Sequence, residues 1–204
     1  PQWRVTAAAG TSFRAPTLYH RFSEYGAPDL QPEKGRNVEL GARWTQGESS
    51  VGVVAYRNRV SNLINFGAAG RCDSSFGCYE NVGRAEYKGV TLSAAHRIAG
   101  VSVHGSIDWQ NPRDLDSGKL LARRAKRYAT LGADTLVAGW TLGAELYASA
   151  RRYDNAANTN VLGGYTTLNL YTSKRVARDV TLLARVDNLA DKDYQLARTY
   201  ATGG

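Results

Sequence analysis

Apolar and polar residues alternate along most of the chain with a period of two, the period of a β-strand. In residues 101–110, valine, isoleucine and tryptophan take one side, and serine, histidine and aspartate take the other. Residues 37–44, 140–151 and 180–187 repeat this pattern. One apolar and one polar face is typical of antiparallel sheets. Between residues 51 and 60 both sides are mixed, so the pattern assigns no outward face there.

The alternation predicts about nine strands, most of them roughly twice as long as the mean strand of a soluble protein. The expected strands cover residues 3–13, 36–46, 50–65, 79–98, 101–111, 123–137, 140–153, 164–176 and 180–194. Long polar segments follow the odd-numbered strands, at 14–35, 66–78, 112–122 and 154–163. Tight turns follow the even-numbered strands, at 47–49, 99–100, 138–139 and 177–179.

This regular exchange of long loops and short turns indicates a β-barrel of the bacterial outer membrane, which carries loops outside and turns on the periplasmic side. A soluble β-sandwich would share the two-faced strands but not the strict alternation of connection lengths. We therefore predict an all-β fold made of antiparallel transmembrane β-barrel strands. The residues expected to face lipid are Val38, Leu40, Val101, Val103, Leu142 and Leu146.

Tryptophans support this interpretation. Trp3, Trp44 and Trp140 fall at the short-turn ends of expected strands, and Trp109 falls at a long-loop end. All four lie on the apolar side of the alternation. Indole rings favour the membrane interface, where the ring is half desolvated and its N–H stays hydrated. We expect these four residues to form interface aromatics.

Composition and charge limit the classes of partner that can be expected. The chain has 204 residues, a formal net charge of +8, no methionine, and Pro1 as its first residue. We expect it to be part of a longer or processed protein. No apolar run approaches the ~18 residues of a membrane helix. The basic run at 123–127 is interpreted as a solvated strand end, because no RNA-binding aromatic motif accompanies it, so nucleic acid is not an expected partner.

The cysteines and histidines offer little chemistry. Cys72 and Cys78 could form a redox pair, half a metal site or a local disulfide. No second Cys pair and no histidine lies nearby, so their spacing in a turn-rich stretch favours a disulfide formed in an oxidising compartment. No Gly-x-Ser-x-Gly motif or complete P-loop is present. We expect neither an enzyme nor a bound metal.

Several motifs carry a family resemblance. Residues 10–18 (GTSFRAPTL) with 28–34 (PDLQPEK), 79–90 (YENVGRAEYKGV) and 187–194 (DNLADKDY) resemble the barrel signatures of TonB-dependent outer-membrane receptors. Two further segments, 56–64 (YRNRVSNLI) and 120–126 (LLARRAK), are similar to the vitamin B12 (cobalamin) branch of that family. Ala125 stands where many siderophore receptors carry proline.

The resemblance implies a barrel of about 22 strands, plugged by an N-terminal domain that carries the TonB box. Residues 1–204 would then be the C-terminal portion of that barrel, roughly its thirteenth to twenty-first strands. The plug, the early strands and the last strand would lie outside this portion. Binding through rigid loops and transport require no catalytic residues from such a segment and no cofactor. The sequence leaves open whether calcium orders the loops.

The function implied is a receptor and active transporter of the bacterial outer membrane that takes up a scarce nutrient, with cobalamin as the leading ligand. The expected partners are TonB through the plug, outer-membrane lipid, lipopolysaccharide and a small-molecule ligand. A ferric-siderophore receptor of the same family is the close alternative. A passive porin or adhesion barrel and a soluble β-sandwich binding module remain open as more distant ones.

Ligand contacts are expected from aromatic anchors and polar partners in the long loops. The candidates are Tyr19, Tyr25, Arg71, Asp73, Tyr79, Arg113, Tyr153, Asp154, Asn155 and Tyr165.

Overall fold

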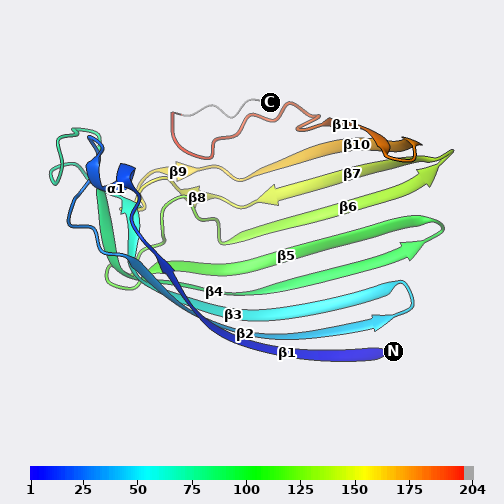
Figure 1. Cartoon of the computed structure of the whole chain (residues 1–204), viewed down its shortest axis with the longest axis horizontal. Helices are drawn as coiled ribbons and strands as arrows, with labels where there is room; N and C mark the ends of the chain where they lie inside the picture. Colours follow the sequence, from blue (N-terminus) through cyan, green and yellow to red (C-terminus); the bar gives the residue numbers. More distant parts are fainter. Residues whose placement is uncertain (200–204) are drawn as a thin grey trace.

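The computed structural model describes residues 1–199, apart from the side chain of Val82, and shows one large antiparallel sheet (Figure 1). Its nine strands pair in the order β1-β2-β3-β4-β5-β6-β7-β10-β11. They are β1 Gln2–Arg14, β2 Glu33–Gln46, β3 Ser49–Phe66, β4 Tyr79–Ile98, β5 Val101–Asp114, β6 Arg127–Val137, β7 Trp140–Ser149, β10 Tyr165–Ala177 and β11 Val180–Val186. A two-stranded hairpin, β8 Arg152–Tyr153 with β9 Val161–Leu162, interrupts the series between β7 and β10. Neighbours in sequence are therefore neighbours in the sheet.

The connections divide the sheet into a turn end and a loop end (Figure 1). At the turn end, the β4–β5 and β6–β7 hairpins close with Ala99-Gly100 and Ala138-Gly139, and both residues of each pair have positive φ. This is the conformation that matches the right-handed twist of a hairpin. All long connections lie at the other end, together with buried apolar residues. Those residues are Ala27, Leu30, Cys78, Ala85, Leu121, Ala125 and Leu162.

Most strand limits agree with the predicted ones to within three residues, and three limits differ by four residues or more. β6 begins at Arg127 instead of residue 123, because Arg123 takes a positive φ that a strand cannot continue. β7 ends at Ser149, where the chain turns into the β8–β9 hairpin. β11 ends at Val186, and Asn188, also with positive φ, caps the next turn by accepting from the Lys192 backbone N–H.

A short helix, α1 (Leu18–Phe22), lies in the loop between β1 and β2 and was not predicted. Thr17 caps it: its Oγ1 accepts from the His20 backbone N–H, and His20 Nδ1 accepts from the Thr17 backbone N–H. Such a reciprocal cap satisfies two donors that a helix start would otherwise leave open. No helix in residues 1–199 is long and apolar enough to cross a membrane.

The pairing register separates the side chains into two faces, because directly opposed residues share a face. One face is apolar over much of its length, and we call it the convex face. It carries all six residues predicted to face lipid. In the mixed stretch of β3, Val51, Val53 and Ala55 belong to this face, since they oppose Trp44, Ala42 and Leu40.

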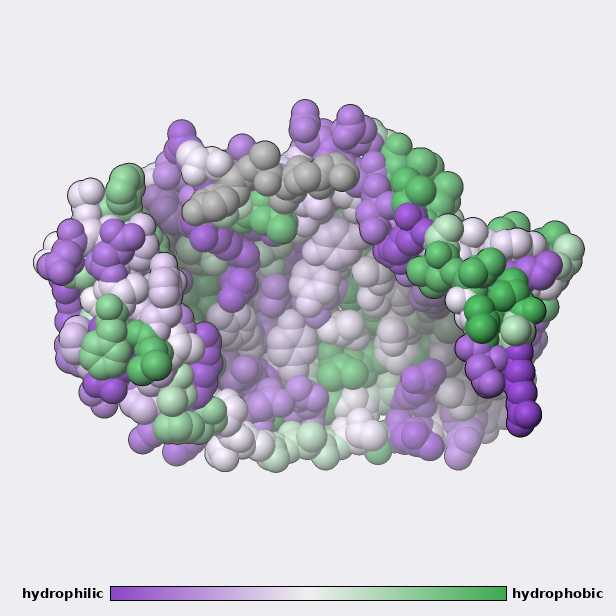
Figure 2. Space-filling view, turned by 45° about the horizontal axis from the view of Figure 1, so that its top comes forward, coloured by the Kyte–Doolittle hydropathy of each residue, from purple (hydrophilic) through white to green (hydrophobic). Residues whose placement is uncertain are grey.

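The opposite, concave face carries mainly tyrosine, threonine, serine, asparagine and acidic side chains. Figure 2 looks into its hollow, where purple and pale residues predominate. Two glycines let aromatic rings lie flat on this face. A side chain at Gly89 would collide with the Tyr56 ring, and one at Gly143 would collide with the Tyr171 ring. Glycine therefore fixes where these rings lie.

All four tryptophans lie on the convex face. Trp3 directly opposes Trp44 near the turn end, and Trp140, also at the turn end, carries the Lys174 ammonium 5.2 Å from its ring centroid. Trp109 lies further toward the loop end, opposite Val90. Their placement on the apolar face agrees with the predicted interface role, which stays a prediction.

The face assignment can be tested with two adjacent residues of β6. Leu131 lies on the convex face, half exposed, and Thr130 lies on the concave face, bonded to Ser106. In the intact barrel, Leu131→Arg should destabilise the protein by about 2–4 kcal/mol, because a cation would enter the apolar band. Thr130→Arg should destabilise it far less. Unfolding in urea with lipid present would measure both, and equal destabilisation would contradict the assignment.

Candidate functional site

Five aromatic side chains meet at the loop end, from α1 and its loop and from the ends of β3 and β4. We call them the mouth cluster: Tyr19, His20, Tyr25, Phe66 and Tyr79. Tyr79 is central, with ring centroids 4.7 Å from His20, 5.4 Å from Phe66 and 6.1 Å from Tyr19. Tyr25 packs edge-on against Phe66 at 5.8 Å. The structure thus brings together three of the predicted ligand residues, Tyr19, Tyr25 and Tyr79.

The expected disulfide joins Cys72 and Cys78 and closes a small loop beside Phe66, with a Cα–Cα distance of 5.7 Å. The Gly67 backbone N–H donates to the Cys78 carbonyl at 2.9 Å, which ties the loop to the end of β3. Gly77 has a φ of +146° and lies so close to the Phe66 ring that no side chain fits there. The disulfide loop is therefore fastened to the mouth cluster.

Two predicted polar residues border this loop. The Arg71 guanidinium lies 3.7 Å from the Asp29 carboxylate, and both side chains are well exposed. Asp73 is exposed next to the disulfide. An exposed ion pair contributes little to stability. These groups remain accessible to a molecule approaching the loop end.

His20 contributes to both the helix cap and the mouth cluster. Burial, together with the nearby Arg14 guanidinium, lowers the pKa of His20 below its ordinary value of 6.5. The neutral ring is the form that can accept the Thr17 backbone N–H. The cap and the pKa shift therefore favour the same protonation state.

Among the predicted residues, Asp154 and Asn155 use their side-chain oxygens inside the loops, and Tyr153 uses its backbone carbonyl there. The Arg123 backbone N–H donates to the Tyr153 carbonyl, and Arg123 Nε lies 2.8 Å from Asp154 Oδ1. Asn155 Oδ1 accepts from the backbone N–H groups of residues 159 and 160. These three residues shape the connection between β7 and β10.

The predicted ligand residue Arg113 does not belong to the mouth cluster. The register places it on the convex face, opposite Glu86, where it donates to Asn111 Oδ1 and to the Gly118 carbonyl. Arg113 therefore faces away from the concave surface.

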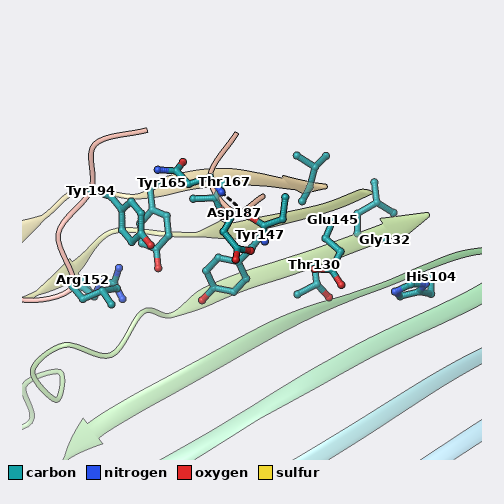
Figure 3. Close-up of a pocket in the computed structure, with 15 residues that line it drawn as sticks. His104, Thr130, Gly132, Glu145, Tyr147, Arg152, Tyr165, Thr167, Asp187 and Tyr194 are labelled. Carbon is teal, nitrogen blue, oxygen red and sulfur yellow. Dashed lines mark hydrogen bonds between the residues drawn. The ribbon is translucent and has the colours of Figure 1, made fainter. Parts of the chain in front are cut away.

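A hollow of about 800 Å³ opens on the concave face near β6, β7 and β10 (Figure 3). Tyr165, a predicted ligand residue, stacks on Tyr194 with ring centroids 4.0 Å apart, and Tyr147 lies 5.9 Å away. The Arg152 guanidinium lies 5.2 Å from the Tyr165 centroid. Three rings and a cation therefore form one wall of the hollow.

Arg152 is unusual in its hydrogen bonding. Its Nε and Nη2 atoms are buried and have no hydrogen-bond partner in the described part of the chain. Buried donors are almost always paired, so a guanidinium in this state favours contact with an anionic or π-rich group. The sequence patterns did not predict Arg152, Tyr147 or Tyr194 as ligand residues. The alternation Leu146-Tyr147-Ala148 was the signal that could have placed Tyr147 on the concave face.

A second hollow of about 720 Å³ lies on the concave face of β1 to β6. At its floor Asp108, only 4% exposed, accepts from Tyr56 Oη at 3.1 Å and from Thr91 Oγ1. On β7 and β11, Arg185 bridges Glu145 and Asp187 at 2.8 and 2.7 Å. The concave face is therefore a polar, internally bonded surface. Within residues 1–199, no three His, Cys, Asp or Glu side chains gather closely enough to hold a metal ion.

The family described as TonB dependent receptor-like, beta-barrel matches residues 1–189. Two curated relatives are the vitamin B12 transporters BtuB of Photobacterium profundum and Vibrio vulnificus. Each is 30% identical and matches 97% of the chain. The chain spans 33% and 32% of their lengths, about a third.

Solved structures share the fold. The copper transporter OprC superposes with a TM-score of 0.76 at 22% identity, covering 95% of this chain and 32% of that one. The ferric enterobactin receptor PfeA from Pseudomonas aeruginosa superposes with a TM-score of 0.71 at 20% identity, covering 94% and 33%. At these identities the likeness concerns the fold alone.

The disulfide should order its loop without supporting the whole barrel. Closing so short a loop is worth about 2 kcal/mol, so replacing both cysteines by serine should speed amide exchange in residues 67–78 roughly 30-fold. Hydrogen exchange with mass spectrometry would measure this, and Ser75→Ala in the same loop is the control. A large fall in the melting temperature of the double variant would show instead that the disulfide supports the barrel.

The His20 shift predicts a pH dependence of the helix cap. Because folding lowers the pKa of His20, its contribution to stability is present above about pH 6.5 and is lost as the pH falls through the folded-state value. An NMR titration of the His20 Cε1 proton should show a midpoint below 6.5. The His20→Gln variant assigns the signal by its loss and keeps an acceptor at every pH. A midpoint at or above 6.5 would contradict the shift.

Proposed function

Because the chain belongs to the β-barrel family of TonB-dependent receptors, we propose that it forms part of an outer-membrane receptor that imports cobalamin. The observation that supports cobalamin as the ligand is the 30% identity to two vitamin B12 transporters along nearly the whole chain. The copper and siderophore receptors share the fold at 22% and 20% identity. Identities this low support the fold and give no support to copper or a siderophore as the ligand.

Residues 1–204 would supply nine consecutive strands of a larger, closed barrel in this receptor. Among the described residues, β1 and β11 each have a single strand neighbour, and the rest of the receptor would cover their free edges. Closure is required because unpaired backbone groups are costly in the hydrocarbon of a membrane. We expect about 22 strands in the whole barrel, with a plug domain inside it.

The loop end would capture the ligand. Cobalamin is a broad macrocycle fringed by amide groups, so it requires flat apolar surfaces together with hydrogen-bond partners. The mouth cluster offers partly exposed rings that the disulfide loop and the α1 cap hold in place before binding, which reduces the entropy lost on binding. Arg71 and Asp73 offer polar groups at the same end.

The concave face would line the path below the mouth cluster. Its tyrosines and its other polar side chains would present a hydrated surface along which a polar ligand can pass. Uptake would proceed when TonB, acting through the plug domain, opens this path. Non-covalent contacts suffice for such a mechanism, so the chain would act as a transporter and not as an enzyme. Outer-membrane lipid and lipopolysaccharide would surround the convex face.

The test uses the full-length receptor in cells that lack their own cobalamin receptor. We expect saturable binding of labelled cyanocobalamin and accumulation that depends on TonB. Tyr79→Ala should weaken binding about tenfold, because it removes the central ring of the mouth cluster, whereas Tyr79→Phe should keep most of it. Phe13→Ala is the matched control, since Phe13 is an exposed aromatic at the loop end of the convex face.

Each outcome separates one alternative. TonB-dependent uptake of a ferric siderophore without cobalamin binding would overturn the ligand and keep the receptor class. Uptake that is unsaturable and independent of TonB would indicate a passive porin. Equal loss of binding in Tyr79→Ala and Phe13→Ala would remove the mouth cluster from the binding site.

A further inference from the structure

Cations gather on the convex face, near the loop end, from the four consecutive strands β2, β3, β4 and β5. Two adjacent rows of the register hold them. One row runs Thr11, Arg36, Arg59, Glu86, Arg113, and the next runs Ala9, Val38, Arg57, Lys88, Asn111. We call Arg36, Arg57, Arg59, Lys88 and Arg113 the outward basic patch. These two rows contain five cationic side chains and one carboxylate, that of Glu86.

The pairing of like charges in the patch is unfavourable by itself. Arg36 directly opposes Arg59, and Arg57 directly opposes Lys88. Like charges at directly opposed positions destabilise an antiparallel pair. The sheet therefore tolerates two repulsive contacts at one place.

Glu86 relieves this repulsion only in part. Its side chain is 6% exposed and lies 2.6 Å from Arg57, 3.0 Å from Arg59 and 3.5 Å from Lys88. The three cationic side chains stay 51–57% exposed. One buried carboxylate thus holds three cations side by side, and about half of each cationic side chain remains open to the outside. An external anion would complete the balance of charge.

The patch borders the apolar band directly. The next row toward the turn end runs Ala7, Leu40, Ala55, Val90, Trp109, and the row after it runs Val5, Ala42, Val53, Leu92, Ile107. Leu40 and Leu92 are 59% and 40% exposed. A molecule seated on the patch would therefore meet cations at one end and an apolar surface at the other.

The height of the patch agrees with a membrane surface. Arg36, Arg59 and Lys88 each lie ten residues from the turn end of their strand. Ten residues extend about 33 Å along a strand, and the usual barrel tilt reduces this to a height of about 25 Å. The apolar band of outer-membrane barrels has the same height. The patch therefore lies where the hydrocarbon ends on the loop side.

We propose that the outward basic patch binds the phosphate groups of lipopolysaccharide in the outer leaflet, with the acyl chains against Leu40, Val90 and Leu92. Guanidinium groups suit phosphate oxygens, and continuity with the apolar band favours a phosphorylated lipid over a soluble anion or a nucleic acid. This site rests on the proposed outer-membrane receptor for its orientation. It involves the opposite face of the sheet from the mouth cluster and the hollows.

The test measures lipid binding to the full-length receptor in neutral detergent by native mass spectrometry. The probes are lipid A with both phosphates, fully dephosphorylated lipid A, and inorganic phosphate alone. We expect binding of phosphorylated lipid A at least tenfold tighter than of the dephosphorylated lipid. Lys88→Gln, which keeps both Arg–Glu86 pairs, should weaken binding about fivefold. The combined replacement of Arg57, Arg59 and Lys88 by glutamine should weaken it at least tenfold, and Lys88→Arg should retain it.

Arg43→Gln is the matched control, because Arg43 lies on the concave face of β2, in the same strand as Arg36. Equal binding of the two lipid A forms would overturn the proposal, as would unchanged binding by the Lys88→Gln variant. Complete competition by inorganic phosphate would also overturn it in favour of a soluble-anion site. Cobalamin binding should be unchanged in Lys88→Gln, so failure here is distinct from failure of the proposed uptake function.

Discussion

Continuous backbone hydrogen bonding between neighbouring strands is the constraint on which the rest of this structure depends. A bilayer offers no water to satisfy N–H and C=O groups, so every spanning strand needs two partners along its length. The simplest solution is the one seen here, where strands adjacent in sequence pair in order and only the β8–β9 hairpin leaves the series. Irregular backbone is thereby confined to the two ends. Long loops can vary at one end without disturbing the pairing, and this is why the mouth cluster and its disulfide lie there.

Most of the fold could be predicted because a strand with one apolar face leaves a period of two in the sequence. The nine strands and the alternation of turns and loops follow from period-two patterning and from Ala-Gly turns such as Ala99-Gly100. The strand limits near residues 123 and 187 could not be predicted in this way. They depend on positive φ at Arg123 and Asn188 and on side-chain caps, which leave no periodic signal. The helix α1 was not predicted for a similar reason, since its cap uses histidine at the position where glutamate or glutamine is usual.

The candidate site was predictable only where a loop contributes its residues locally. Tyr19, Tyr25 and the two cysteines fall in recognisable loop segments, Tyr79 begins the strand that follows the second of these loops, and the structure brings them together. Arg152 beside Tyr165 depends on where the short hairpin folds back, which sequence patterning does not specify. The outward basic patch is the clearest case of information that exists only in the register. Arg36, Arg57 and Lys88 are far apart in the sequence, and pairing alone places them side by side.

Register is therefore as important for the surfaces of this sheet as for its stability. Tyr56 and Arg57 are adjacent in β3, yet Tyr56 bonds Asp108 on the concave face and Arg57 bonds Glu86 on the convex face. A slip of one residue would exchange the two faces, moving a guanidinium into the hollow and a ring toward the membrane surface. The fit of the Tyr56 ring over Gly89 opposes such a slip, because neighbouring positions carry side chains that would block the ring. The packing of one ring on one glycine thus helps to maintain two chemically different surfaces.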